Sequence, residues 1–468
     1  MTIDLTPYLS DNGPKYLMIA RAISEAVRQG ELLPGTRLPP HRQLAENLGV
    51  SVQTVSRAYA QAEKMGLVQA RVGSGTWVNA LDEVRESAYL HSNEARLETP
   101  LIDLSIAHPV CPPGHHLLFR QTLAELAELA SPEIISACRP IAGLLHQRER
   151  ASAWLSSRLH VPGEPDDRVL CNGAAHGLML AISSVVQHGD LVLTEALTDH
   201  GLIALSRTLG FQLRGIAIDA EGIVPEALEL ACQRYKPRAL YLTPTQLNPT
   251  GASMSEARRD AVAEVLARHR VWLIEDDVHA LLEAPGFTPV TARIPQQSFH
   301  ITSLTKVTVP GLRAGYLTVP RGQLHHVLPR MRATTWMATP LIFEIADRWL
   351  ADGHVETLAT EQRTLLAERQ QLARRLLGHH TLESRPTSLH VWVSLPDAWR
   401  AEELQQQAEQ EGLAITTAVP FMVERTPPPR RIRISLGAEQ DIRRLEEGLE
   451  RLVVLLDEAP PPMMQIVY

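Results

Sequence analysis

The sequence contains few cysteines and no long apolar run. Only four cysteines occur among 468 residues, and no two of them have the CxxC spacing of a zinc or redox motif (Cys111, Cys138, Cys171 and Cys232). This scarcity argues against a disulfide scaffold, and no metal site is predicted. No run of about eighteen apolar residues exists, so no membrane span is expected. Residues 1–13 lack a basic stretch followed by an apolar one, so no secretory signal is expected. Together these absences predict a cytoplasmic protein.

The chain also lacks an overall positive charge, because its formal net charge is −8. The charge is unevenly distributed, however. Residues 14–78 carry eight Lys or Arg side chains and only four Glu side chains. A small basic region in an otherwise acidic chain is expected when only that region contacts the phosphates of a nucleic acid. The length by itself predicts two or three domains.

A polar stretch divides the chain in two. Residues 79–99 are rich in Glu, Arg, Ser and Asn, with few large apolar side chains and no clear period, so they are predicted to be a linker. The linker separates an N-terminal domain, residues 10–78, from a large domain, residues 100–457. No internal repeat is present.

The N-terminal domain is predicted to contain three helices and a two-stranded wing. The apolar stripes favour helices over residues 15–29, 41–48 and 52–65. Gly49 is expected to end the second helix and Ser51 to cap the third. The third helix then turns Gln53, Thr54 and Arg57 away from its apolar face. Residues 67–78 contain two glycines and are expected to form the wing.

A short helix, a tight turn and a helix with exposed polar side chains form a helix-turn-helix, whose second helix suits the major groove. Residues 35–78 also resemble the GntR family of winged-helix regulators nearly end to end. The alternative is a protein-contact domain with merely solvated arginines. The resemblance implies DNA contacts from Arg37, Arg42, Ser51, Gln53, Thr54, Arg57, Arg71 and Gly75.

The large domain alternates short apolar strands with helices. This order predicts an α/β fold with a mostly parallel sheet covered on both faces, followed by a smaller C-terminal α+β subdomain over about residues 382–456. Strands are expected over residues 169–171, 191–194, 239–243, 271–274, 300–303 and 314–319. Helices are expected over residues 177–186, 255–269 and 341–351.

Four features of the large domain suggest one chemistry. Lys306 follows a predicted strand, and a lysine in a partly dry pocket can form a Schiff base with an aldehyde. In the same segment as Lys306, Arg313 and Ser303 can donate to a phosphate. Asp276 ends another predicted strand, where a carboxylate can keep a pyridine nitrogen protonated. Asn248 lies in an Asn-Pro-Thr-Gly turn and could donate to a phenolate oxygen. The amides of Ala174 and Ala175 open a helix and could hold a phosphate.

Taken singly, these features have ordinary explanations, such as a surface lysine, a helix-capping aspartate or a packing turn. Their order and spacing resemble the fold-type-I aminotransferase domain, and the whole chain resembles the MocR subfamily of GntR regulators. The resemblance implies pyridoxal 5′-phosphate on Lys306, with Asp276 at the pyridine nitrogen and Asn248 at the ring oxygen. It places Ala174, Ala175, Ser303 and Arg313 at the phosphate. It also implies Arg433 as the group that binds an amino acid's carboxylate, where the alternative is an edge-strand surface charge.

Three tyrosines that such proteins commonly carry are replaced. Asp199 and His200 occupy the region of a tyrosine that stacks on the ring, His279 replaces one after Asp276, and Cys138 replaces one from the partner subunit. His200 or His279 could compensate. The losses would weaken cofactor binding, so ligand sensing is favoured over efficient transamination.

The sequence therefore predicts a DNA-binding transcription regulator that senses pyridoxal phosphate or an amino compound. Its expected partners are a double-stranded DNA operator, the small-molecule effector and a second copy in a head-to-tail homodimer. Physiological turnover is not expected, although a half-reaction of aminotransferase type is compatible with the site. The alternatives are a working aminotransferase with an appended DNA-binding domain, or a degenerate regulator that no longer binds the cofactor.

Overall fold

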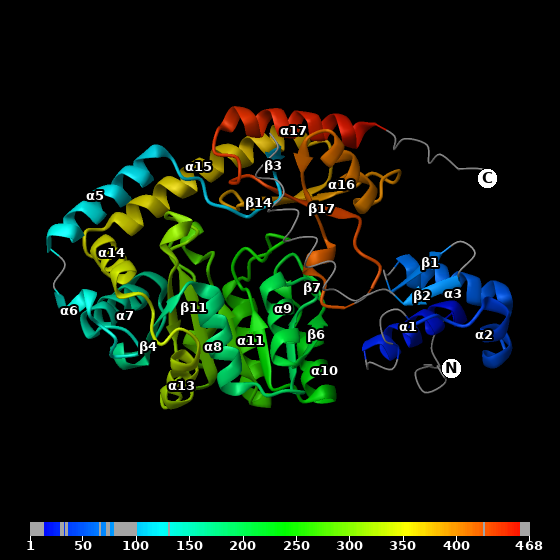
Figure 1. Ribbon diagram of the computed structural model, residues 1–468, viewed down its shortest axis with the longest axis horizontal. Coiled ribbons are helices and arrows are strands. Elements are labelled where there is room, and N and C mark those ends of the chain that lie inside the picture. The colour runs from blue at the N-terminus through cyan, green and yellow to red at the C-terminus, as the bar shows by residue number, and fades with distance from the viewer. Residues whose placement is uncertain are drawn as a thin grey trace. The chain divides into compact units, whose positions relative to one another are not determined.

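The computed structural model describes residues 14–28, 32, 36–64, 67–71, 75–78, 101–129, 132–424 and 426–458. The chain divides into two compact units, residues 1–100 with 424–429 and residues 101–423 with 430–468. We call them the head and the large unit (Figure 1). The predicted linker, residues 79–99, and the first residues of the predicted N-terminal domain, 10–13, lie outside the described residues.

The head has the predicted three helices and wing. Its antiparallel strands pair Val68 with Val78, and the apolar faces of its helices enclose a core that includes Ile23, Val55 and Leu67. This is the burial expected from the helical spacing of the apolar residues. The elements are α1 (Lys15–Arg28), α2 (His41–Leu48), α3 (Val52–Lys64), β1 (Val68–Arg71) and β2 (Gly75–Val78).

Two small residues set the turn between α2 and α3. Gly49 ends α2 in the left-handed conformation, with φ of 60°, which costs glycine little. Ser51 then caps α3, because its Oγ accepts a hydrogen bond from the Thr54 amide at 3.1 Å. Tyr59 OH donates a hydrogen bond to Pro39 O at 2.7 Å, which connects α3 to the segment just before α2. The predictions that Gly49 ends the second helix and that Ser51 caps the third are both confirmed.

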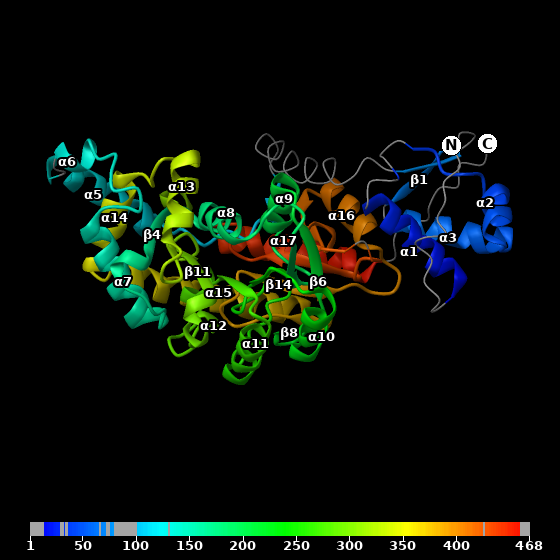
Figure 2. The ribbon, with the colours of Figure 1, turned by 90° about the horizontal axis from the view of Figure 1, so that it is seen from below.

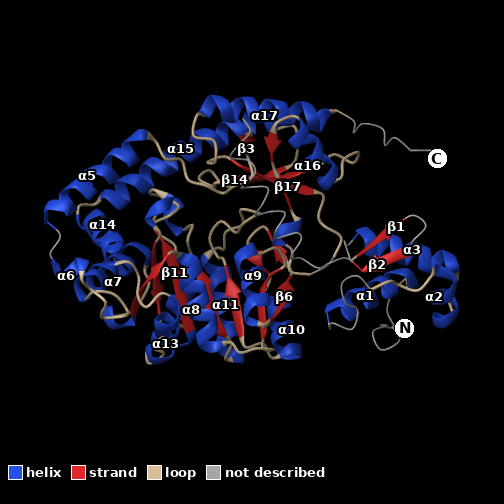
Figure 3. Cartoon of the chain, viewed as in Figure 1, coloured by secondary structure: helices blue, strands red, loops and turns tan. Residues whose placement is uncertain are grey.

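The large unit is built on a seven-stranded sheet, whose strands Figure 3 draws in red. The strand order is β4-β12-β11-β10-β9-β5-β6, and β12 runs antiparallel to both of its neighbours while the other pairs are parallel. The predicted mostly parallel sheet is thus confirmed. The strands are β4 (Arg168–Asn172), β5 (Leu191–Glu195), β6 (Gln212–Ile216), β9 (Ala239–Leu242), β10 (Trp272–Asp276), β11 (Ser298–Ser303) and β12 (Ala314–Thr318).

Helices cover both faces of this sheet (Figure 2). Ala239 and Ile274 pack into one apolar cluster, while the neighbouring Leu240 and Leu273 pack into another on the opposite face. Burial on both faces explains why the strands are continuous apolar runs. One face carries α8 (Ala174–Val185) and α9 (His200–Leu209); the other carries α10 (Pro225–Tyr235), α11 (Glu256–His269) and α12 (Val290–Arg293).

A smaller antiparallel sheet forms the core of the C-terminal subdomain, in the order β13-β14-β17-β16. Its elements are β13 (Leu382–Glu383), β14 (His390–Ser394), α16 (Ala401–Gln410), β15 (Leu413–Ala414), β16 (Thr416–Thr417), β17 (Arg431–Ser435) and α17 (Ile442–Asp457). The short strand β3 (Ile102–Asp103) joins this subdomain by pairing with β15.

The remaining elements of the large unit are α5 (Pro113–Leu129), α6 (Pro132–Ile135), α7 (Leu145–Leu159), β7 (Ile218–Asp219), β8 (Gly222–Ile223), α13 (Leu324–Thr334), α14 (Pro340–Ala351) and α15 (His354–Leu377). Within the described part of the chain, no helix combines the length and the apolar character needed to cross a membrane.

Candidate functional site

The sheet topology brings the predicted cofactor residues to one edge. Asp276 ends β10, Ser303 ends β11 and Asn172 ends β4, and these three strands run in the same direction. Because β12 runs the other way, it begins at that same edge, with Gly315 opposite Ser303. Arg313 immediately precedes β12. Ligands of open α/β sheets bind at the carboxyl ends of the parallel strands.

An anion cradle forms where β4 turns into α8. Gly173, with φ of 84°, precedes Ala174 and Ala175 at the start of α8. A Cβ atom on Gly173 would lie 2.6 Å from Arg313 Nη2, and one on Gly315 would lie 2.6 Å from the Gly173 carbonyl carbon. The two glycines therefore let a guanidinium approach the free amides of a helix N-terminus. That combination of donors fits a phosphate group.

Asp276 has the surroundings expected of a partner for a pyridine nitrogen. Its Oδ2 accepts a hydrogen bond from Tyr241 OH at 2.8 Å. Burial raises the pKa of Asp276 to about 6. Proximity of a protonated ring nitrogen would favour the charged carboxylate. Tyr241 was not predicted from the sequence. It is paired with Ile274, two residues before Asp276, so strand register puts both side chains on one face.

Lys306 lies at the same edge, half-buried, and its Nζ donates to Ala107 O at 2.9 Å. The pKa of Lys306 is lowered to about 8, mainly by burial. The charges of Asp199 and Asp276 oppose this shift, and those of Arg433 and Arg313 contribute to it. An amine with a lowered pKa is an effective nucleophile toward an aldehyde. The donor set at this edge thus fits pyridoxal phosphate at the amine, the ring nitrogen and the phosphate.

Arg433 is buried on β17, between β14 and β16, with 1% of its surface exposed. The alternative of an edge-strand surface charge is therefore wrong. Its Nη1 donates to Asn248 Oδ1 at 2.9 Å and its Nη2 donates to Ser105 O. The guanidinium also lies 4.9 Å from the centre of the Phe421 ring. Arg433 is thus bonded to Asn248, the residue predicted at the ring oxygen.

The residues that replace the tyrosines have different surroundings. His279 is buried, with Nδ1 3.1 Å from Gln246 O, and burial lowers its pKa to about 4, so its ring is neutral at pH 7. His200 opens α9, half-exposed, with its ring centre 6.5 Å from that of Phe421. Asp199 caps α9 by accepting from the Gly201 amide. Cys138 is exposed.

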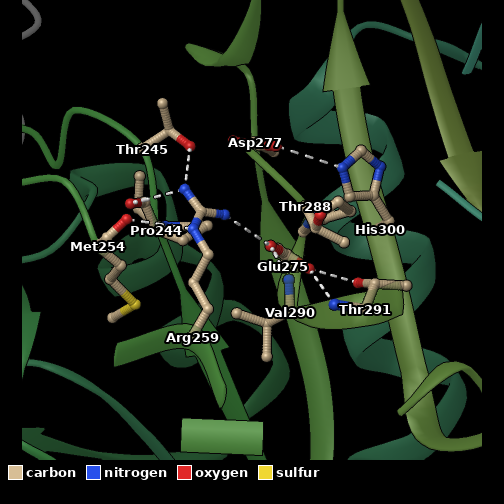
Figure 4. Close-up of polar contacts among 12 residues, drawn as sticks. Pro244, Thr245, Met254, Arg259, Glu275, Asp277, Thr288, Val290, Thr291 and His300 are labelled. Carbon is tan, nitrogen blue, oxygen red and sulfur yellow. Dashed lines mark hydrogen bonds and ion pairs between the residues drawn. The ribbon is translucent and has the colours of Figure 1, made fainter. Parts of the chain in front are cut away.

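A buried charged cluster fixes β10 on the face opposite to Asp276 (Figure 4). Arg259 Nη1 lies 3.9 Å from Glu275 Oε1, and Arg259 Nη2 donates to Thr245 Oγ1 at 3.1 Å. Glu275 also accepts from the Val290 amide at 2.9 Å. Asp277 lies 3.6 Å from His300 Nε2. The sequence offered no sign of this cluster, because its members are brought together only by strand pairing.

In the head, most predicted DNA-contacting side chains are accessible. Arg37, Arg42, Ser51, Gln53, Arg57 and Gly75 are exposed and Thr54 is partly exposed, whereas the Arg71 side chain lies outside the description. The Arg37 guanidinium lies 5.9 Å from the centre of the Trp77 ring on the wing, and that of Arg57 lies 4.4 Å from the Tyr16 ring. These side chains offer the donors that phosphate and base edges accept.

Comparison with known proteins agrees with this two-part organisation. The family described as bacterial regulatory proteins, gntR family, matches residues 15–78. The family described as aminotransferase class I and II matches residues 99–452. The fold of the large unit is also that of an archaeal alanine:glyoxylate aminotransferase, with a TM-score of 0.73 and 21% identity, over 81% of this chain and 96% of the other.

Relatives with both parts are named as regulators. The chain is 30% identical to the HTH-type transcriptional regulator YdeF of Bacillus subtilis, over 95% of each chain. It is also 30% identical to PtsJ of Salmonella typhimurium, a vitamin B6 salvage pathway transcriptional repressor, over 80% of this chain and 85% of PtsJ. The probable rhizopine catabolism regulatory protein MocR of Rhizobium meliloti is 25% identical over 94% of this chain and 93% of MocR. The chain belongs to the GntR family of transcription regulators, in the MocR subfamily, which joins a winged helix-turn-helix to an aminotransferase class I and II domain.

Proposed function

We propose that this regulator binds operator DNA through its head and that pyridoxal phosphate, or an amino compound reacting with it, changes its DNA affinity through Lys306. The single observation that carries the proposal is the hydrogen bond from Lys306 Nζ to Ala107 O at 2.9 Å. It connects the predicted cofactor lysine to the first residues of the large unit. The relative PtsJ, named for vitamin B6 salvage, supports a vitamin B6 compound as effector.

Several groups on this chain would hold the cofactor. Lys306 would bind its aldehyde carbon, Asp276 would face the ring nitrogen, and the phosphate would lie among Arg313, Ser303 and the amides of Ala174 and Ala175. When bound, pyridoxal phosphate supplies an aldehyde that combines with amines and a ring that withdraws electrons. Asn248 would face the ring oxygen with its amide nitrogen, because its Oδ1 already accepts from Arg433.

Residues 105–107 are where the state of the site would be sensed. Ser105 O accepts from Arg433, Ile106 O accepts from Ser435 and Ala107 O accepts from Lys306. If the Lys306 amine formed a covalent bond with the cofactor aldehyde, Ala107 O would lose its charged hydrogen-bond donor. A carboxylate bound by Arg433 would compete with Ser105 O. Charged hydrogen bonds are worth about 1.5–3 kcal/mol each, so losing them would alter how residues 105–107 are held.

This segment is well placed to pass the change along the chain. It begins two residues after β3, and residues 79–101 join β3 to the wing strand β2 in sequence. A ligand can shift DNA affinity only by its differential affinity for the two arrangements. The proposed difference is whether residues 105–107 remain bonded to Lys306 and Arg433.

The proposal is tested with DNA sites selected from a random pool by the wild-type protein. DNA affinity is measured by fluorescence anisotropy with and without pyridoxal phosphate, for wild type, Lys306→Ala and Lys236→Ala. Lys236 is a matched control, because the chain has only four lysines and this is the other one in the large unit, exposed after α10. We expect wild type and Lys236→Ala to respond equally and Lys306→Ala not to respond. An equal response in all three proteins would refute the proposal.

Absorbance separates cofactor binding from its effect on DNA. A band near the visible edge is expected after adding pyridoxal phosphate to wild type and Lys236→Ala, and not to Lys306→Ala. Spectra that stay flat in all three would leave a DNA-binding protein whose large unit has another use. Sustained turnover of an amino donor with a keto acid would instead identify a working aminotransferase.

We also propose a head-to-tail homodimer, which would present two heads to two half-sites. The resemblance to the MocR subfamily supports this proposal, because it implies such a dimer. Sedimentation equilibrium would give the mass of a dimer, and a monomer at all micromolar concentrations would contradict it.

A further inference from the structure

We propose that His379, His380 and Asp457 form a binding site for a divalent transition metal of the Zn²⁺ class. One ligand atom from each of these residues lies within 4.8 Å of the others. Two imidazole nitrogens and one carboxylate oxygen are a ligand set that zinc prefers. The small number of cysteines argues against a metal site with thiolate ligands, but it does not argue against a site with histidine and aspartate ligands. The site lies in the C-terminal subdomain, away from the cofactor residues in sequence and fold.

The spacing of the ligand atoms matches a metal site. His379 Nε2 lies 3.1 Å from Asp457 Oδ1, and His380 Nε2 lies 3.3 Å from the same oxygen. Around a tetrahedral zinc ion with bonds of about 2.0–2.1 Å, neighbouring ligand atoms are about 3.3 Å apart. The two imidazole rings lie side by side, with centres 4.1 Å apart, so both Nε2 atoms face one carboxylate.

His380 provides a second, independent observation. Its side chain is only 9% exposed, and its Nε2 contacts Asp457 Oδ1 at 3.3 Å without the geometry of a well-formed hydrogen bond. A buried polar nitrogen whose hydrogen bond is poorly directed is only partly compensated for the loss of water. Coordination of a metal through Nε2 would satisfy it. The side chains of His379 and Asp457 are 50% and 51% exposed, which leaves room for entry of the ion and for a water ligand.

The surrounding backbone also favours a cation. His379 and His380 follow Gly378, the residue after the C-terminal end of α15, and Asp457 is the last residue of α17. Helix C-termini carry partial negative charge, and here two of them contribute to one site. The helices already share the apolar core of the subdomain, through residues such as Leu372, Leu377 and Leu452. A bound metal would cross-link their ends and stabilise the folded subdomain.

Zinc binding to the full, tag-free chain tests the proposal after chelator treatment. Isothermal titration with Zn²⁺ compares wild type with His380→Ala and Asp457→Asn. His325→Ala is the matched control, because His325 and His326 are another adjacent pair, with ring centres 3.9 Å apart on α13, outside the three-ligand group. We expect one strong site in wild type and His325→Ala, and an affinity weaker by at least about tenfold in both site variants.

Thermal unfolding gives a second readout. Zinc should raise the melting temperature of wild type and His325→Ala but leave that of Asp457→Asn unchanged. If Asp457→Asn does not fold, His379→Gln replaces it in both experiments. Equal zinc affinity in wild type and the site variants would overturn the proposal, since binding would then be adventitious. So would a loss in His325→Ala as large as that in His380→Ala. Neither outcome depends on whether pyridoxal phosphate binds to Lys306.

Discussion

The head and the large unit expose their functional groups in opposite ways. The polar side chains predicted to contact DNA are mostly exposed and come from one continuous stretch, Arg37 to Gly75. The polar groups of the candidate cofactor site are mostly buried or half-buried, with Arg313 exposed, and they come from positions as far apart as Ser105 and Arg433. Exposed groups need no partner in the fold, whereas buried charges must be compensated. Replacing an exposed head side chain that does not cap a helix should therefore alter DNA binding and leave stability unchanged, whereas replacing a buried charge in the large unit should alter stability as well.

The largest expected effect is on the buried cluster behind Asp276. Arg259→Met removes a fully buried cation and leaves Glu275 without its countercharge. We expect the free energy of unfolding of the large unit to fall by about 3–5 kcal/mol. Urea unfolding followed by circular dichroism measures it. Arg443→Met is the comparison, because the exposed Arg443 guanidinium lies 3.7 Å from the exposed Asp441, and losing this pair should cost about 1 kcal/mol or less. Equal losses would contradict the distinction between buried and exposed charges.

The next effect is on DNA recognition by the head. Gln53→Ala should weaken binding to the selected site by about 1–3 kcal/mol and leave binding to random DNA unchanged, because an exposed Gln on α3 can read a base edge. Fluorescence anisotropy with both DNAs measures it. Arg42→Gln is the comparison, since loss of a phosphate contact should weaken both complexes and lower the salt slope by about 1. If Gln53→Ala also changes the free energy of unfolding, then Gln53 stabilises the fold of the head and does not act only at the DNA.

The reactivity of Lys306 gives a pH-dependent prediction. Only the neutral amine attacks an aldehyde, and burial lowers the pKa of Lys306 to about 8. The rate of pyridoxal phosphate capture should rise about tenfold per pH unit below pH 8 and level off above it. Stopped-flow absorbance from pH 6 to 10 measures this rate, with Lys306→Ala giving the background. A rate that keeps rising to pH 10 would mean that the amine is not in a buried environment.

The smallest effect concerns the cap of α3. Ser51→Ala removes the side-chain oxygen that accepts from the Thr54 amide, and it should lower the local stability of the head by about 1 kcal/mol. Ser51→Gly should cost only a few tenths of a kcal/mol. Hydrogen exchange of the α3 amides, without DNA, measures both variants. If the two cost the same, the hydrogen bond contributes little and Ser51 acts only at the DNA.

The predictions from sequence succeeded where the physical cause was local. Gly49 and Ser51 mark the ends of α2 and α3, because each acts through its own backbone angles or a bond to a residue three positions away. Six of the seven strands of the large sheet were located by their apolar runs, with ends that differ by one or two residues, as in β10, which continues to Asp276. The edge strand β6 was not predicted. Strand ends depend on pairing with a neighbour, here Asp276 with Ile301, which a single sequence does not contain.

The sequence by itself determined the two-part organisation, the helix-turn-helix, the mostly parallel sheet and the residue types expected at a cofactor site. Only the tertiary structure decided what those residues contact. Tyr241 meets Asp276 through strand register, Arg433 is buried against Asn248, and Lys306 donates to Ala107. The meeting of His380 with Asp457 likewise needs two helix ends to converge. The spacing of residues along the chain predicts hydrogen bonds between residues a few positions apart. Contacts between distant residues depend on how the sheets and helices pack, which the spacing does not show.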